Sequence, residues 1–174
     1  MSRETSFTSS VYITRSINLS IIIYTQIYTS RSTKVGIFSI ITKGISKQQI
    51  PLYGNGLNIR DWIFVDDHID AILATVINGK LGNSYCIGAS EQLTNLSVVQ
   101  DICNLLDQYL PQSTPYSNLI TLVEDRLGHD QRYAIDSTRI KQEIGWKPRY
   151  SFKKGLQITV KWFIENHKLY NKIL

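Results

Sequence analysis

From residue 37 onward, the chain alternates between two hydrophobic patterns. Apolar residues three and four positions apart predict helices, and short apolar or alternating runs bounded by turn residues predict strands. Predicted helices cover residues 37–45, 67–78, 95–110, 137–144 and 152–167. Predicted strands cover residues 50–53, 62–65, 84–88, 119–123 and 132–135. Helices and strands that follow one another in this way are typical of α/β proteins.

Polar side chains that accept a backbone N–H mark where two of these helices begin. Asp66 or Asp67 is the predicted cap of the second helix, and Thr94 or Asn95 is the predicted cap of the third. The second helix carries apolar residues on one face, and they are Ile69, Ile72, Leu73 and Val76. Pro111 ends the third helix because proline cannot continue the hydrogen-bond ladder.

A short glycine turn lies between the first two predicted strands. Gly54-Asn55-Gly56 is predicted to be a hairpin-type loop, and Arg60 follows it before the second strand. At that place a loop can present a fixed guanidinium to a phosphate through two parallel hydrogen bonds.

The first 33 residues differ in composition from the rest of the chain. They hold fourteen Ser or Thr residues, three Arg, one acidic residue and no Gly or Pro. Three interpretations stay open: a segment foreign to the fold (a shifted reading frame or a remnant of gene decay), a divergent strand and loop, or a targeting sequence.

Composition excludes several classes of protein. Hydrophobic residues make up 43% and charged residues 19% of the chain, as in a soluble globular protein rather than a disordered one. Cys86 and Cys103 are far apart, which favours buried reduced thiols in a cytoplasmic protein over a disulfide framework or a metal site. No apolar run reaches the roughly 18 residues of a membrane span.

The net charge of +5 is concentrated near the C-terminus, where residues 139–174 hold nine Lys or Arg and two acids. These charges interleave with apolar residues, as on the solvated face of amphipathic helices, so we expect no nucleic-acid partner.

A second dense polar cluster is Asp125-Arg126-Leu127-Gly128-His129-Asp130, between two predicted strands. Taken alone, it is equally a solvated turn with internal ion pairs. The order of residues from Pro51 to His68, followed by this cluster and by Arg132-Tyr133-Ala134-Ile135-Asp136, resembles the nucleotide-sugar 4,6-dehydratases. These belong to the extended short-chain dehydrogenase group, and the resemblance is strongest to the dTDP-glucose 4,6-dehydratases.

The resemblance covers residues 34–174 and implies the substrate-binding part of a Rossmann-type, NAD-dependent dehydratase/epimerase fold. Most of the dinucleotide-binding sheet would be missing. The implied partners are a dTDP-sugar or thymidine diphosphate, a second copy of the chain as in the usual homodimer, or a separate chain carrying the cofactor domain.

The same resemblance implies a set of substrate-binding residues. Tyr53 would stack on the base, Arg60 would pair with the diphosphate, and Asn95 would hydrogen-bond the nucleotide. The remaining members are Pro51, Leu52, Asp125, Arg126, Leu127, Gly128 and His129. Lys34 and Val35 match a family Lys-Leu pair less closely. Leu127 stands where the family has proline, and Cys86 where it has asparagine.

Each member of this set also has a structural explanation. Tyr53 would fill a cleft wall, Arg60 would pair with Asp61 or Asp66, and Asn95 would cap a helix.

The motifs for chemistry are not in this sequence. A dinucleotide site needs Gly-x-Gly-x-x-Gly between a strand and a helix, and the turn at Gly54 lacks the third glycine. The catalytic Tyr-x-x-x-Lys of the family has one formal match, Tyr150 to Lys154, at the start of the last helix, which we interpret as coincidence. We therefore expect no catalytic residue, no metal site and no bound NAD in this chain alone. A non-catalytic nucleotide-sugar binder and one half of a split enzyme are the alternatives.

Overall fold

The computed structural model describes residues 9–13, 21–25, 36–125 and 127–170. These residues belong to two compact units. The first unit comprises Met1–Ile27, Asp61–Glu91 and Ala134–Tyr150, and the second comprises Tyr28–Arg60, Gln92–Tyr133 and Ser151–Leu174. Each unit is therefore assembled from separate stretches of the chain.

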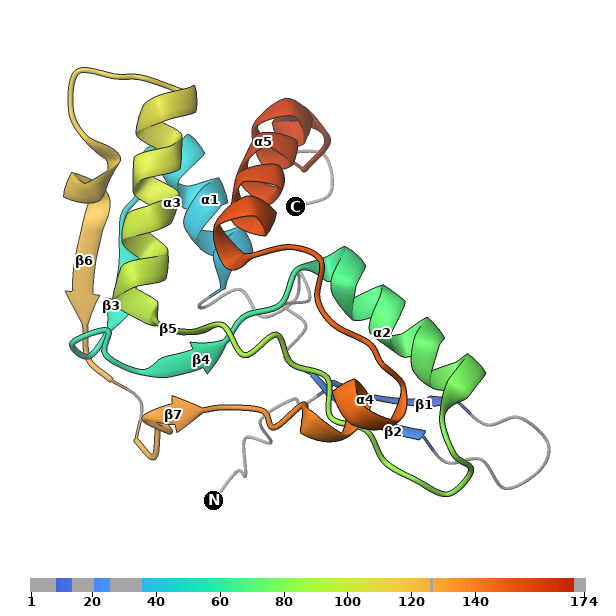
Figure 1. Cartoon of the computed structure of the whole chain (residues 1–174). Coiled ribbons are helices and arrows are strands. Elements are labelled where there is room, and N and C mark those ends of the chain that lie inside the picture. Colours follow the sequence, from blue (N-terminus) through green and yellow to red (C-terminus); the bar gives the residue numbers. More distant parts are fainter. Residues whose placement is uncertain (1–8, 14–20, 26–35, 126, 171–174) are drawn as a thin grey trace. The chain divides into compact units, whose positions relative to one another are not determined.

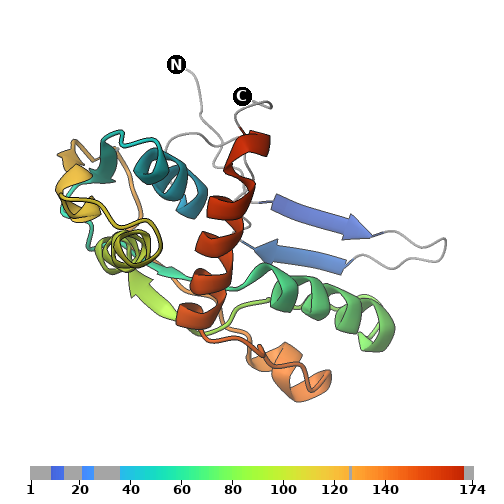
Figure 2. The same ribbon diagram turned by 90° about the horizontal axis from the view of Figure 1, so that it is seen from above.

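Three helices and a pair of parallel strands form most of the second unit. The helices are α1 (Ile37–Ile45), α3 (Asn95–Tyr109) and α5 (Phe152–Tyr170), and the strands are β3 (Ile50–Tyr53) and β6 (Ile120–Val123). Strand β3 pairs with β6 in the register Ile50 to Ile120. A 3₁₀ turn, Tyr116–Leu119, leads into β6. Figure 2 shows α1 and α5 beside α3, which is seen end-on.

The core of the second unit lies between these helices and β3. Ile41, Ile50, Ile102 and Leu106 are fully buried in it. A side chain at Gly44 would place its Cβ 2.5 Å from Leu106, so glycine lets α1 approach α3 closely. Cys103 is buried here as expected, and burial raises the pKa of its thiol to about 11.

A second, three-stranded sheet contains Arg60. Its order is β5 (Gln92–Thr94), β4 (Ile59–Asp61) and β7 (Arg132–Tyr133), with β4 in the middle and parallel to β7. The strand predicted over residues 62–65 is wrong: the strand ends at Asp61, and Phe64 is already the N-cap of α2. The predicted hairpin is also wrong, because β3 and β4 belong to different sheets.

Helix α2 (Val65–Asn78) and the short α4 (Thr138–Glu143) belong to the first unit, together with the antiparallel strands β1 (Ser9–Ile13) and β2 (Ile21–Thr25) (Figure 1). The core of this unit contains Ala71, Tyr85, Ile87, Ile140 and Trp146. Ile72 and Val76 pack against this core, whereas Ile69 and Leu73 are about half exposed.

Asp67 does not cap α2 as predicted. Phe64 is the N-cap and contributes no side-chain hydrogen bond. The Asp67 carboxylate instead accepts the backbone N–H groups of Arg149 and Tyr150, at 2.9 and 3.0 Å. Asp67 therefore joins α2 to residues 149 and 150 within the first unit and does not cap the helix.

The strand predicted over residues 84–88 is not formed, because this segment pairs with no strand among the described residues. The residues nevertheless alternate, with Tyr85 and Ile87 buried and Ser84 and Cys86 exposed. The prediction that Cys86 is buried is therefore wrong: its side chain lies on the outward face of this extended segment.

Helix α1 ends in a conformation that its sequence does not favour. Lys47 has a left-handed φ of 55°, its N–H donates to Gly44 O at 2.9 Å, and Gln48 N donates to Lys43 O at 2.8 Å. Glycine is the preferred residue at this position of the motif. We therefore expect Lys47→Gly to raise the free energy of unfolding by about 1 kcal/mol. Urea unfolding followed by circular dichroism measures this change.

Lys43→Gly is the matched control for Lys47→Gly. It makes the same exchange inside α1, where glycine should lower the free energy of unfolding by roughly 1 kcal/mol. Equal shifts in the two variants would contradict the assignment of strain to Lys47.

Among the described residues, no helix has the length and apolar character that crossing a membrane requires.

Candidate functional site

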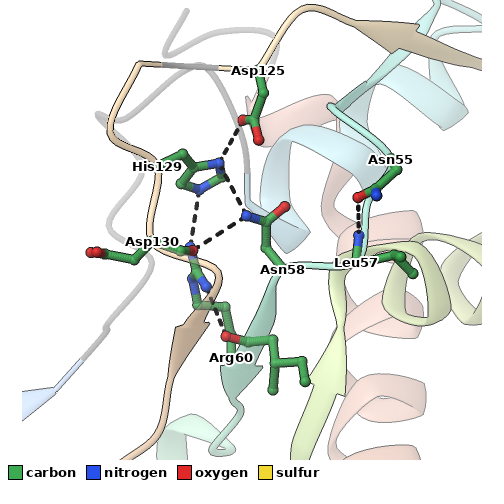
Figure 3. Close-up of polar contacts among 8 residues, drawn as sticks. Asn55, Leu57, Asn58, Arg60, Asp125, His129 and Asp130 are labelled. Carbon is green, nitrogen blue, oxygen red and sulfur yellow. Dashed lines mark hydrogen bonds and ion pairs between the residues drawn. The ribbon is translucent and has the colours of Figure 1, made fainter.

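Arg60 lies in β4, the middle strand of the small sheet, and its side chain is 7% exposed. Its guanidinium donates to three acceptors. Nη1 donates to Ile59 O at 2.7 Å, and Nη2 donates to Asp130 O at 2.9 Å and to His129 Nε2 at 3.0 Å (Figure 3). The ring of Tyr133, on the neighbouring strand, lies 5.8 Å from the guanidinium carbon.

The charge of this buried guanidinium has no carboxylate beside it among the described residues. Of its five N–H groups, three make these hydrogen bonds, and none of the three acceptors is anionic. Removing a cation from water is costly unless an anion or several dipoles compensate for it. Arg60 therefore keeps its charge and two N–H groups without an acceptor among the described residues.

The sequence left open whether Arg60 pairs with Asp61 or Asp66. The Asp61 carboxylate instead accepts the backbone N–H groups of Glu91 and Ser90, at 2.9 and 3.3 Å. Burial raises the pKa of Asp61, and the hydrogen bonds from Glu91 and Ser90 oppose that rise. Asp66 is exposed on α2, and no ion pair among the described residues joins either acid to Arg60.

His129 lies between Arg60 and the Asp125 carboxylate and contacts both. Because the Arg60 N–H points at Nε2, that nitrogen must be the acceptor and Nδ1 must carry the proton. Nδ1 lies 2.6 Å from Asp125 Oδ1, the distance of a strong, charge-assisted hydrogen bond. The chain of contacts runs from Asp125 through His129 to Arg60, so the loop and β4 form one polar network (Figure 3).

The glycine turn and this loop approach each other closely. Gly54 has φ +57°, and a Cβ there would lie 2.9 Å from Asp125 Oδ2. Its N–H donates to Val123 O at 2.9 Å, just before the loop begins. Glycine at this position therefore permits both the left-handed backbone conformation and the close approach of Asp125.

Asn58, which no sequence motif marks as a site residue, holds the network together. Its side chain is 5% exposed and donates through Nδ2 to Asp130 O at 3.3 Å, and the same nitrogen is 3.4 Å from His129 Nδ1. The backbone carbonyl oxygen of Asn58 accepts the Asn95 backbone N–H at 3.0 Å. An asparagine two residues before Arg60 was the available signal, but nothing in the local pattern shows that it reaches a loop 70 residues away.

An open cavity of about 650 Å³ lies beside this network. Its walls come from the glycine turn, from β4 and from the 125–132 loop, and they include Asn55, Asn58, Asp125, His129 and Arg132. His129 is both a wall of the cavity and the partner of Arg60. Gln131 and Arg132 also line the cavity, and neither belongs to the set of predicted site residues.

The structure brings several predicted site residues together and separates others. Arg60, Asp125 and His129 are joined by hydrogen bonds, and Pro51 and Tyr53 are partly exposed on β3 nearby in the same unit. Leu52 is 1% exposed and belongs to the core, so the structure does not place it on a surface that a ligand reaches.

Asn95 is not the helix cap. Thr94 is the N-cap of α3, and its Oγ1 accepts the Ser97 N–H at 3.2 Å. The Asn95 side chain makes no hydrogen bond to another described residue, so its amide is available at the start of α3.

At the tip of the loop, the side chain of Leu127 is fully exposed, and Gly128 has φ +72°. The other predicted residues, Lys34, Val35 and Arg126, lie outside the described residues.

The glycine turn does not fit the pyrophosphate of NAD. The N–H groups of Gly54 and Gly56 already donate to Val123 O and Tyr53 O, and β4 rather than a helix follows the turn. Tyr150 packs its ring against Phe64, with the centroids 4.8 Å apart, which is a structural role. No group of three or more His, Cys, Asp or Glu residues in the described part of the chain is arranged to bind a metal ion.

Comparison with known proteins identifies the family of this arrangement. The family model of GDP-mannose 4,6 dehydratase matches residues 6–159. The dTDP-glucose 4,6-dehydratase of Xanthomonas campestris pv. campestris (strain B100) is 43% identical over 129 residues, which are 73% of this chain and 37% of the relative. That of Salmonella typhimurium is 43% identical over 134 residues, 77% of this chain and 37% of the relative.

Solved structures give the same result. The dTDP-glucose 4,6-dehydratase of Bacillus anthracis in complex with NAD is 38% identical, with a TM-score of 0.68 over 78% of this chain and 41% of that one. The enzyme of Streptomyces venezuelae with NAD and TYD bound is 33% identical, with a TM-score of 0.69 over 77% and 40% of the two chains. The predicted α/β, Rossmann-type fold class is thus confirmed for part of the family fold.

The chain therefore spans a little over a third of the length of its curated relatives. Because the family model matches most of the chain and the relatives are dTDP-glucose 4,6-dehydratases at 43% identity, this chain belongs to the GDP-mannose 4,6-dehydratase family and resembles its dTDP-glucose branch.

Proposed function

We propose that this chain is the nucleotide-sugar-binding part of a dTDP-glucose 4,6-dehydratase, and that alone it binds a nucleoside diphosphate without converting the sugar. The observation that carries the proposal is the buried Arg60 guanidinium, which has no carboxylate beside it among the described residues and sits behind the His129 loop. A diphosphate would supply the missing negative charge. Asn95 and the partly exposed Tyr53 would contact the nucleoside.

Dehydration of the sugar needs more than this site. Enzymes of this kind oxidise C4, eliminate water across C5–C6 and return the hydride to C6, which requires a bound nicotinamide and a base at the sugar O4. Two observations argue against both functions in this chain: the N–H groups of Gly54 and Gly56 already donate to protein carbonyls, and the ring of Tyr150 packs against Phe64. We therefore propose that this chain binds the nucleoside diphosphate and that the part of the family fold outside its match carries out the dehydration.

We expect the purified chain, mixed with dTDP-glucose and NAD, to form no 4-keto-6-deoxy sugar and to retain no NAD after gel filtration. Product formation is followed by the absorbance of the keto sugar in alkali, with the Salmonella typhimurium relative as the positive control. Turnover above background that follows the concentration of the purified chain would overturn the proposal.

The proposed ligand is a dTDP-sugar or thymidine diphosphate, and the proposed macromolecular partner is a polypeptide that carries the cofactor domain. The alternative is a binder that has lost chemistry altogether. The neighbouring reading frame distinguishes the two. A coding region containing Gly-x-Gly-x-x-Gly and Tyr-x-x-x-Lys favours a divided enzyme, and a region without these motifs favours the binder.

A further inference from the structure

His129 occupies the part of Arg60 that a phosphate needs. A guanidinium presents two parallel N–H groups only through Nη2 together with either Nε or Nη1. One Nη2 N–H of Arg60 donates to Asp130 O at 2.9 Å and the other to His129 Nε2 at 3.0 Å. The two N–H groups that remain belong to Nε and Nη1, because the other Nη1 N–H donates to Ile59 O. These two are not parallel, so bidentate binding of a phosphate requires one Nη2 acceptor to leave.

Of the two Nη2 acceptors, His129 is the one that can leave. Asp130 O is a backbone carbonyl that also accepts from Asn58 Nδ2 at 3.3 Å, whereas His129 contributes only its side chain. The loop next to the ring is open. Leu127 is fully exposed, and no described atom lies within 4 Å of the Cβ that a side chain at Gly128 would have. Rotation of the imidazole away from the guanidinium therefore disturbs no packed core.

The proton count of His129 changes when the ring leaves Arg60. While the guanidinium donates to Nε2, that nitrogen is a bare acceptor and the ring is neutral, with its proton on Nδ1. Once a phosphate takes the guanidinium N–H, Nε2 can bind a proton and donate it to the phosphate. The imidazolium then lies between the phosphate and Asp125 Oδ1, which is 2.6 Å from Nδ1, and both negative charges stabilise it.

The charged groups that face the ring have opposite effects on its protonation. Arg60 of β4 opposes a positive charge on the ring, and Asp125 of the loop favours one. Asn58, 3.4 Å from Nδ1, is neutral, and Arg132 of β7 lines the same cavity. The Asp130 carboxylate points away from the ring (Figure 3). The contact with Arg60 is therefore the one whose loss allows the ring to take up a proton.

We propose that His129 is a proton-linked gate on Arg60. In the free chain the ring blocks the parallel N–H pairs of the guanidinium. A nucleoside diphosphate displaces the ring and is bound together with one proton from solvent, which goes to Nε2, and no covalent bond of protein or ligand changes. This inference rests on the proposed nucleotide binding at Arg60. The affinity should fall as the pH rises, because the complex holds one more proton than the free chain and ligand.

Calorimetric titration of the full chain with dTDP-glucose, between about pH 6 and pH 8.5, tests the gate across the range in which histidine titrates. This ligand is a diphosphate diester whose charge is constant over that range, so any proton taken up belongs to the protein. In buffers of different ionisation enthalpy, we expect uptake of up to about one proton per ligand and a dissociation constant that rises by up to about tenfold per pH unit. Binding without proton uptake would overturn the proposal.

Three variants identify the group that takes up the proton. His129→Gln keeps a polar amide but cannot be protonated, so uptake should vanish and the affinity should no longer depend on pH. Asp125→Asn keeps an acceptor for Nδ1 but removes the negative charge, so uptake should decrease. Glu124→Gln is the matched control, because Glu124 is an exposed acid of the same loop and its loss changes the net charge equally. It should leave uptake unchanged, and uptake by His129→Gln equal to that of the wild type would contradict the gate.

The free chain provides a test that needs no ligand. NMR of the imidazole nitrogens at about pH 8 should show the His129 proton on Nδ1 and a bare Nε2. On acidification, the Arg60 side-chain N–H signals should shift as Nε2 gains a proton, and His129→Gln should abolish this shift. A proton on Nε2 of the neutral ring, or Arg60 signals that do not follow His129, would overturn the proposal. Failure of dTDP-glucose to bind while these signals behave as expected would overturn the proposed function and still support the proton-linked contact.

Discussion

Replacing Arg60 with alanine should weaken the binding of thymidine diphosphate roughly tenfold to a hundredfold, the loss expected for one charge-assisted contact. The guanidinium is 7% exposed and keeps two N–H groups free of hydrogen bonds to described residues, so an incoming diphosphate meets a desolvated and preorganised cation. Isothermal titration calorimetry at fixed ionic strength measures the dissociation constant.

Two further variants separate the contribution of the Arg60 charge from that of its hydrogen-bond geometry and from stacking by Tyr53. Arg60→Lys should recover only part of the affinity, because an ammonium is a point charge and cannot form the two parallel hydrogen bonds of the guanidinium fork. Tyr53→Ala should weaken thymidine diphosphate but hardly affect inorganic pyrophosphate, because stacking requires a base. Tyr53 is partly exposed on β3.

The control for net charge is Arg139→Ala. Arg139 is an exposed cation of the first unit that pairs with Glu143 at 3.0 Å, so its loss should change the affinity by less than about twofold, as expected of a screened surface charge. If all four variants bind as the wild type does, the surface from Pro51 to Arg60 is scaffold and the ligand site is elsewhere. If Arg139→Ala weakens binding as much as Arg60→Ala, the interaction depends on net charge alone.

Local chemistry let the sequence predict the helices and one of the caps. Thr94 was one of two candidates for the N-cap of α3, and its hydroxyl does accept the Ser97 N–H. The strand at residues 50–53 and the helices α1, α3 and α5 depend mainly on local spacing of apolar residues, and each lies close to where the pattern places it. The polar cluster that begins at Asp125 and ends at Asp130 was expected between two strands, and β6 and β7 flank it in the structure.

The incorrect predictions concern residues whose secondary structure or hydrogen bonding depends on partners that are distant in the sequence. Residues 84–88 have the alternation of a strand, but a strand also needs a neighbour to pair with, and the described part of the chain provides none. Asn58 and Asp67 act on groups about 70 and 80 residues away in the sequence, so no local pattern could reveal them. The meeting of Arg60 with His129 was anticipated only through resemblance, because spacing alone does not show that β4 and β7 are neighbours.

Replacing Asp67 with alanine should lower the free energy of unfolding by roughly 3 kcal/mol or more, since two backbone N–H groups would lose their acceptor at a buried position. The carboxylate is 1% exposed and accepts from Arg149 N and Tyr150 N at 2.9 and 3.0 Å. It also faces the Arg149 guanidinium, whose Nε is 3.7 Å away. A loss of this size is a large fraction of the stability of a typical domain.

Asp67→Asn and Asp66→Ala show how much of the loss in unfolding free energy comes from the hydrogen bonds of the Asp67 carboxylate. The asparagine keeps one acceptor oxygen and turns an N–H toward the second donor, so it should retain only part of the stability. Asp66 is the exposed neighbour on the same helix turn, and its replacement should shift the free energy of unfolding by no more than about 0.5 kcal/mol. Chemical unfolding in dilute solution gives all three values. Equal values for Asp66→Ala and Asp67→Ala would show that the Asp67 carboxylate does not hold residues 149 and 150 against α2, and that helix-end electrostatics alone determines the effect of these acids.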